Sequence, residues 1–330
     1  MRWIVKRALT VVVTMFSALT LIFFLIRLMP GNPVDVMMAQ LLMQGYSAEE
    51  AAHVVATMVP FVPTDPIHTQ YFEFLKGFFR GDLGASIIYA TPIASILIYA
   101  IPWTVFLVSI SLIISFSLGI LLGMFMAYRR GGVFDRFFSL FSSVTRALPP
   151  YVVGVFLILF LAGQLHWFPI LGPYDSSRFG SKPGFTLDFI ANVFYHAFLP
   201  VMSYVLTSIG GWVLAMKSST VSVLGEYFVT AAEARGLRER RIVTSYVGRN
   251  AILPLFASLA VAIGYIFSGS VFIENIYSYP GIGKFLASSI PTRDYTLMTG
   301  CFLVTTVATV LSNFLADLLY SRLDPRIRLG

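Results

Sequence analysis

Six long apolar stretches constrain what this chain of 330 residues can fold into. Each is longer than the about 20 mostly apolar residues that an α-helix needs to cross a bilayer. The chain is 57% hydrophobic and only 12% charged, whereas soluble domains carry about 25% charged residues. The sequence therefore predicts an all-α polytopic membrane protein with six transmembrane helices. These lie approximately at 8–29, 101–128, 137–163, 195–216, 251–273 and 296–320.

The first stretch resembles a secretory signal because it follows Arg2, Lys6 and Arg7. Its apolar run is longer than the about 7–15 residues of a signal peptide, and no small-residue cleavage site follows it. We therefore expect an uncleaved first helix.

The basic residues indicate how the chain is oriented. If the N-terminus is cytoplasmic, the inside segments 1–7, 129–136, 217–250 and 321–330 hold fifteen of the 23 Lys and Arg residues, and the outside segments hold six. Basic residues collect in cytoplasmic loops of membrane proteins. This distribution predicts a multi-pass protein of the cell membrane with both termini in the cytoplasm. It also accounts for the net charge of +7 without a nucleic-acid partner.

The span positions divide the chain into four parts. We expect an N-terminal transmembrane helix at 1–30, an extracytoplasmic segment at 31–100, a five-helix transmembrane core at 101–320 and a cytoplasmic tail at 321–330. The outer segment is net acidic, and prolines separate its two helix-like stretches. Its size predicts a cap on the membrane domain rather than an independent enzyme.

A phosphate-binding loop, two other enzyme motifs and metal-ligand spacing do not occur in the sequence. The stretch "PGIGK" at 280–284 has Tyr279 where a phosphate-binding loop needs Gly and Phe285 where it needs Ser or Thr. No G-x-S-x-G, H-E-x-x-H or metal-ligand spacing occurs. We therefore predict no catalytic or metal site and no cofactor in this chain. If transport by this chain is driven by ATP, the ATPase must be another polypeptide. A secondary transporter or channel without an ATPase stays open as the alternative, although no ion-coupling set of titratable residues is evident.

Two helices carry features that predict their packing. Small residues recur every four positions in the second span and predict a smooth face that a neighbouring helix can approach closely. Adjacent prolines at 149 and 150 predict a bend or break in the third span. The small residues are Ser115, Gly119, Gly123 and Ala127.

The segment 217–250 is the longest cytoplasmic one, and its pattern predicts two short amphipathic helices that meet at Gly236. In the first helix one face combines aromatic, small and basic residues, and the second starts with a group of arginines. Taken alone, these residues favour either a basic helix held by lipid or a docking site for a partner protein. The face consists of Phe228, Ala231, Ala232 and Arg235, and the arginines are Arg238, Arg240 and Arg241.

Several motifs in this chain resemble those of one protein family. Thr230-Ala231-Ala232-x-x-x-Gly236, with Leu253-Pro254 downstream, is similar to the EAA loop of ABC importer permeases, except that Thr230 replaces the usual Glu. The stretches "AAEARGL" and "RNAILP" resemble the dipeptide/oligopeptide permease subfamily. Further matching motifs run along nearly the whole chain: "LIRLMPGNP" at 25–33, "FLKGFFRGDLGAS" at 74–86, "YRRGGVFDR" at 128–136, "YPGIGKFL" at 279–286, "RDYTLMTG" at 293–300 and the C-terminal "LADLLYSRLDPRIRLG".

This resemblance implies a type I-like importer fold and a permease that forms a translocation path for peptides or oligosaccharides. The implied partners are a second homologous permease, two ABC ATP-binding subunits that hold ATP and Mg, an extracytoplasmic solute-binding protein and the lipid membrane. It also implies that the segment around Gly236 couples this chain to the ATPases, and Glu274 and Asn275 are expected to contact the binding protein. The implied coupling residues are Phe228, Thr230, Ala231, Ala232, Glu233, Arg235, Gly236, Leu237, Arg238 and Arg240.

Overall fold

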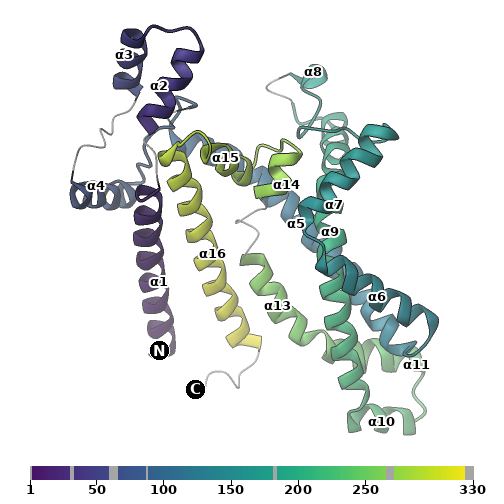
Figure 1. Cartoon of the computed structure of the whole chain (residues 1–330). Helices are drawn as coiled ribbons and strands as arrows, with labels where there is room; N and C mark the ends of the chain where they lie inside the picture. The colour runs from purple at the N-terminus through teal and green to yellow at the C-terminus, as the bar shows by residue number, and fades with distance from the viewer. Residues whose placement is uncertain are drawn as a thin grey trace. The chain divides into compact units, whose positions relative to one another are not determined.

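The computed structural model describes residues 2–29, 33–58, 66–86, 88–180, 184–264 and 271–323. Within these ranges the regular structure is helical, apart from one isolated bridge between Ala85 and Pro92 (Figure 1). The helices are α1 (Arg2–Arg27), α2 (Pro33–Met43), α3 (Ala48–Met58), α4 (Ile67–Arg80), α5 (Ile93–Tyr128), α6 (Val133–Ala147), α7 (Pro150–Leu157), η1 (Ile158–Gln164), α8 (Ser176–Phe179), α9 (Leu187–Leu224), α10 (Tyr227–Ala234), α11 (Glu239–Arg241), η2 (Ile242–Gly248), α12 (Arg249–Ala251), α13 (Leu253–Gly264), α14 (Val271–Ile276), α15 (Ile282–Ser289) and α16 (Tyr295–Leu323).

Four helices in the described residues are long and apolar enough to cross a membrane: α1 from Arg7, α5, α9 and α16 as far as Phe314. Two pairs of helices pass the same test together although each is bent, α6 with α7–η1 by 100° and α11–α12 with α13 by 47°. The all-α polytopic prediction is confirmed. The described part has six spans, as predicted, if each bent pair counts as one.

The third predicted span, 137–163, is not a straight helix. α6 ends at Ala147, Pro149 has extended backbone, and α7 begins at Pro150. Proline has no N–H for the helix ladder and disfavours helical backbone in the residue before it. The predicted break is therefore confirmed, and the two halves point in different directions.

The predicted domain boundaries at 30, 100 and 320 stay predictions. Residues 324–330 of the predicted tail lie outside the described part. By internal packing the chain forms two compact units. The first consists of 1–104, 267–275 and 280–314, and the second consists of 105–266, 276–279 and 315–330.

The first unit has a core built from the start of α5, α15 and the start of α16. Ile93 and Leu97 pack with Leu286, Met298 and Cys301, all of them buried. In the predicted outer segment of this unit, Ser47 and Glu50 cap α3 reciprocally: the Ser47 N–H donates to the Glu50 carboxylate at 2.9 Å, and the Glu50 N–H donates to the Ser47 hydroxyl at 3.3 Å. The Ser47 N–H and the Ser47 hydroxyl, which donates to the same carboxylate at 2.8 Å, hold the pKa of the Glu50 carboxyl below its usual range.

In the second unit α6 and α7 pack along α9, and α5 lies directly against α9 (Figure 1). A Cβ on Gly119 would overlap the Cβ of Trp212, and one on Gly123 would overlap the carbonyl oxygen of Val213. The smooth face predicted for this helix therefore exists, and it permits backbone contact that no larger residue allows.

Candidate functional site

The predicted coupling segment begins with α10, which Gly225 and Glu226 separate from the end of α9. Val229 and Ala232 lie three residues apart on α10 and are both buried, in a cluster with Ile242 and Val247. Elsewhere on α10, Tyr227 is 93% exposed and its neighbour Phe228 is 40% exposed. The chain thus holds one face of α10 itself and leaves these two aromatic side chains exposed.

Gly236 ends α10 in the left-handed conformation that the sequence predicts, with φ +66°. The Gly236 N–H donates to the Glu233 carbonyl at 2.8 Å, and the Leu237 N–H donates to the Ala232 carbonyl at 3.3 Å. This pair of bonds is the Schellman motif, which satisfies the last carbonyls of a helix. Leu237 packs against the cluster beneath α10, which completes the motif.

After Gly236 the chain turns back through α11 into the π-helix η2. The Arg241 N–H donates to the Arg238 carbonyl at 2.8 Å, which closes the first turn. Ile242 and Val247 are five residues apart and both buried, because a π-helix brings side chains at this spacing onto one face. The sequence predicts an α-helical stripe here, so the π geometry is a feature that it did not reveal.

Most of the predicted coupling residues are exposed, but two are not. Ala232 is buried, and Leu237 is half-buried in the same cluster. These two side chains hold α10 in place and offer little surface to a partner. The exposed members are Phe228, Thr230, Ala231, Glu233, Arg235, Gly236, Arg238 and Arg240.

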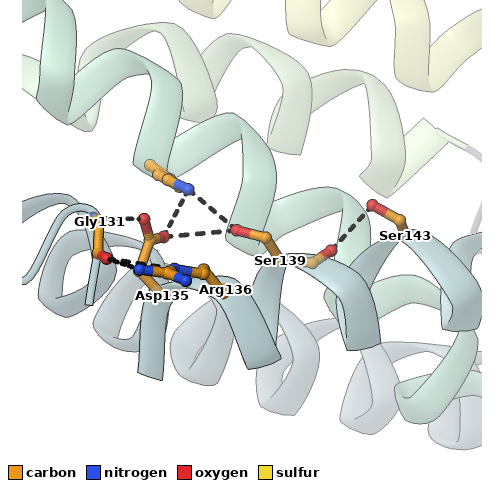
Figure 2. A network of polar contacts seen from close by, with 6 residues as sticks. Gly131, Asp135, Arg136, Ser139 and Ser143 are labelled. Atoms are coloured by element: carbon orange, nitrogen blue, oxygen red, sulfur yellow. Dashed lines mark hydrogen bonds and ion pairs between the residues drawn. The ribbon is translucent and has the colours of Figure 1, made fainter. Parts of the chain in front are cut away.

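A network of polar contacts ties the end of α9 to α6 (Figure 2). The Lys217 ammonium on α9 forms an ion pair with Asp135 at 2.5 Å and donates to the Ser139 hydroxyl at 2.9 Å. The Gly131 N–H donates to the Asp135 carboxylate at 3.0 Å, and the Arg136 guanidinium donates to the Gly131 carbonyl at 3.1 Å. The loop before α6 is therefore fixed to α9 seven residues before α9 ends at Leu224.

In the first unit the "YPGIGKFL" motif is built around Glu274. This side chain is fully buried, and its Oε2 accepts the Gly283 N–H at 2.7 Å. The Thr104 hydroxyl accepts the Ile282 N–H at 2.9 Å. A Cβ on Gly281 would overlap the Glu274 carboxylate, so glycine is required there. Glu274 and Thr104 together hold the first turn of α15.

The structure does not support the expected contact of the Glu274 side chain with a binding protein. Its side chain has 0% exposure and serves the chain's own backbone, so it offers no surface. Asn275, the other residue expected to make that contact, is exposed.

Two other family-like motifs meet at Asp294, which is also fully buried. The Ser86 hydroxyl donates to its Oδ2 at 2.5 Å, and the Leu297 N–H donates to its Oδ1 at 3.0 Å. Asp294 thus caps the beginning of α16 and attaches the "GDLGAS" stretch to this helix. The described residues contain no group of three or more His, Cys, Asp or Glu side chains placed to hold a metal ion.

This arrangement is that of a helical membrane protein with a short, partly exposed helix, α10, packed on its own chain by one face. Residues 119–329 match the family of binding-protein-dependent transport system inner membrane components, and the chain belongs to that family. It is a permease subunit of an ABC importer and a multi-pass protein of the cell membrane. This family membership favours the importer over the secondary transporter or channel that the sequence alone left open.

The chain is similar to curated permeases over almost its full length. It is 30% identical to the di/tripeptide transport system permease protein DppB of Pseudomonas aeruginosa, over 99% of this chain and 98% of that protein. It is 28% identical to the oligopeptide transport system permease protein AppB of Bacillus subtilis, over 98% of each. A probable peptide ABC transporter permease protein of Sinorhizobium fredii is 29% identical, over 99% of each chain.

Proposed function

We propose that this chain pairs with a second, homologous permease to form the translocation path for short peptides. The support is that three similar proteins are named as peptide, di/tripeptide or oligopeptide permeases and align with nearly all of this chain. No comparable observation favours oligosaccharides.

Of two ABC ATP-binding subunits, which hold ATP and Mg, one docks on α10 and the other on the second permease. The observation that carries this assignment is the one-sided packing of α10: Val229 and Ala232 anchor it, and Tyr227 and Phe228 project from it. Aromatic residues are enriched at protein interfaces. Arg235, Arg238 and Arg240 follow in the same segment, are exposed, and carry positive charge that suits an acidic groove.

Force applied at α10 reaches the spans through short, rigid connections. Only Gly225 and Glu226 separate α10 from α9, and the Lys217–Asp135 pair ties α9 to α6. ATP binding that draws the two ATPases together therefore moves α9 and α6 with α10 and opens the path outward. ATP hydrolysis then resets the path. This chain itself breaks no covalent bond.

A solute-binding protein delivers the peptide at the outer surface. The segment 31–100 and the exposed Asn275 contribute to that surface, and both termini lie in the cytoplasm. The count of basic residues along the chain supports this orientation.

The function is tested by affinity purification of this chain from its native membrane, followed by reconstitution in liposomes. We expect a second permease, ATPases and a binding protein to co-purify, and short peptides to stimulate ATP hydrolysis where oligosaccharides do not. Recovery of the chain alone with transport intact would contradict the proposal. Stimulation by sugars alone would contradict the peptide assignment but leave the importer standing.

A further inference from the structure

The helix α4 carries three distinct faces on its 14 residues. One face contains Tyr71 and Phe74, which are half-buried against α1. A second contains Phe72 and Phe79, two turns apart, which are 67% and 77% exposed. The charged face holds exposed side chains, among them Glu73, Lys76 and Arg80. Two exposed phenylalanines on one face need a partner, because a bare aromatic pair of this kind is unfavourable in water.

α4 is attached to a helix that spans the membrane. The Tyr71 and Thr20 hydroxyls are 2.7 Å apart, and the Phe23 ring stacks on Phe74 with 5.4 Å between their centroids. Phe24 also stacks on Tyr71, at 5.7 Å. Figure 1 shows α4 running across α1 near the end of α1, rather than along it.

The contact points fix how deep α4 lies. Thr20 is seven residues before the end of α1 at Arg27, which is about 10 Å along a helix that rises 1.5 Å per residue. Tyr71 therefore reaches α1 below the end of its apolar span. Interfacial helices bury their apolar face by about 5–10 Å at the boundary between headgroups and acyl chains. If Arg27, where α1 ends, marks the boundary of the bilayer, α4 lies at that depth.

We propose that α4 is an interfacial helix that binds lipid, with Phe72 and Phe79 among the acyl chains and Lys76 and Arg80 at the lipid phosphates. Lipid is favoured over a protein partner because α4 is attached to α1, a candidate membrane span on which Leu21 and Leu25 are 59% and 63% exposed. The flanking basic residues suit phosphate, and their apolar stems suit the same boundary. This inference does not depend on the substrate or on the ATPase.

Spin labels on single cysteines test the proposal in the assembled transporter, reconstituted in vesicles of phosphatidylethanolamine and phosphatidylglycerol. The variants are Phe72→Cys, Phe79→Cys and, as the matched control on the charged face, Glu73→Cys. The parent chain is labelled in parallel to measure the background from its own cysteine. This background should be low because Cys301, the one cysteine in the sequence, is buried. Collision with oxygen, which partitions into acyl chains, is compared with collision with a water-soluble nickel chelate.

We expect labels at 72 and 79 to collide preferentially with oxygen and the label at 73 with nickel. Three equal, nickel-dominated accessibilities would place α4 in water and overturn the proposal. Labels at 72 and 79 that are shielded from both reagents would show a protein partner on this face and would equally overturn it. If one of the two phenylalanine variants fails to assemble, the other decides between these outcomes, because both side chains are exposed on the same face.

Discussion

At the scale of single residues, Gly236 has the most specific conformational role in the coupling segment. Its φ of +66° is left-handed, and a Cβ added there would meet no atom within 4 Å. A substitution therefore acts through backbone strain and not through a clash. Left-handed backbone costs ordinary residues about 1–2 kcal/mol, β-branched ones more, whereas Asn adopts it readily.

We expect Gly236→Val to impair transport several-fold and to uncouple it from ATP hydrolysis, because the Schellman end of α10 is lost. Gly236→Asn is the matched control and should keep most of the activity. Both are measured as peptide uptake and ATP hydrolysis in proteoliposomes. Equal, unimpaired uptake by the two variants would remove Gly236 from the coupling mechanism.

The Lys217–Asp135 pair gives a second prediction at this scale. The Asp135 side chain is 8% exposed and that of Lys217 23%, so Lys217→Met leaves a nearly buried carboxylate without its cation. Breaking such a pair costs about 3–5 kcal/mol, here toward the lower end because Lys217 keeps some solvent. We expect a clearly lower Tm for the purified complex.

The double variant Asp135→Asn with Lys217→Met should recover much of that loss, since no charge is then stranded. Arg130→Met, at an exposed position in the same loop, is the control and should change stability by less than about 0.5 kcal/mol. A Lys217→Met complex as stable as the parent would show that the pair does not hold α6 to α9.

The roles of some of these residues could be predicted from the local sequence, and the roles of others could not. Gly236 could be predicted as a helix end because glycine favours left-handed backbone whatever surrounds it. The partners of Lys217, Glu274 and Asp294 could not, because each contact joins residues that only the packed fold brings together. Glu274 shows the consequence: a carboxylate in an outer segment suggests a surface contact, whereas the structure buries it against the backbone of α15.

At the scale of elements, the contact between α5 and α9 depends on small residues. We expect Gly123→Ala to destabilise the transporter, because the new Cβ would overlap the Val213 carbonyl oxygen. Overpacking of this kind costs about 1–3 kcal/mol. The measurement is the Tm of the purified complex in detergent or nanodiscs.

Gly211→Ala is the matched control, because it makes the same change in a helix where the added Cβ meets no atom within 4 Å. It should be neutral or stabilising, since Ala favours helix by about 1 kcal/mol over Gly. If the two variants had the same Tm, the close approach of α5 and α9 would be in doubt.

Apolar length predicted where the spans lie, and proline predicted the break at Pro149, because both are local properties of the chain. The π-helix η2 was not predictable, since hydrophobic spacing alone does not separate it from an α-helix over seven residues. The true length of α9, from Leu187 to Leu224, was also missed, because its polar ends continue the helix outside the apolar stretch.

At the scale of the whole molecule, the account rests on α10 as the place where ATPases dock. Photocrosslinking tests this most directly, with benzoylphenylalanine replacing Tyr227, which is 93% exposed on α10. The matched control is the same replacement of Phe185, which is 92% exposed and precedes the other end of α9, about 57 Å of helix away. We expect Tyr227 to crosslink to an ATP-binding subunit and Phe185 not to. Crosslinks from position 227 to lipid alone, or ATPase crosslinks of equal yield from both positions, would contradict the docking of the ATPase on α10.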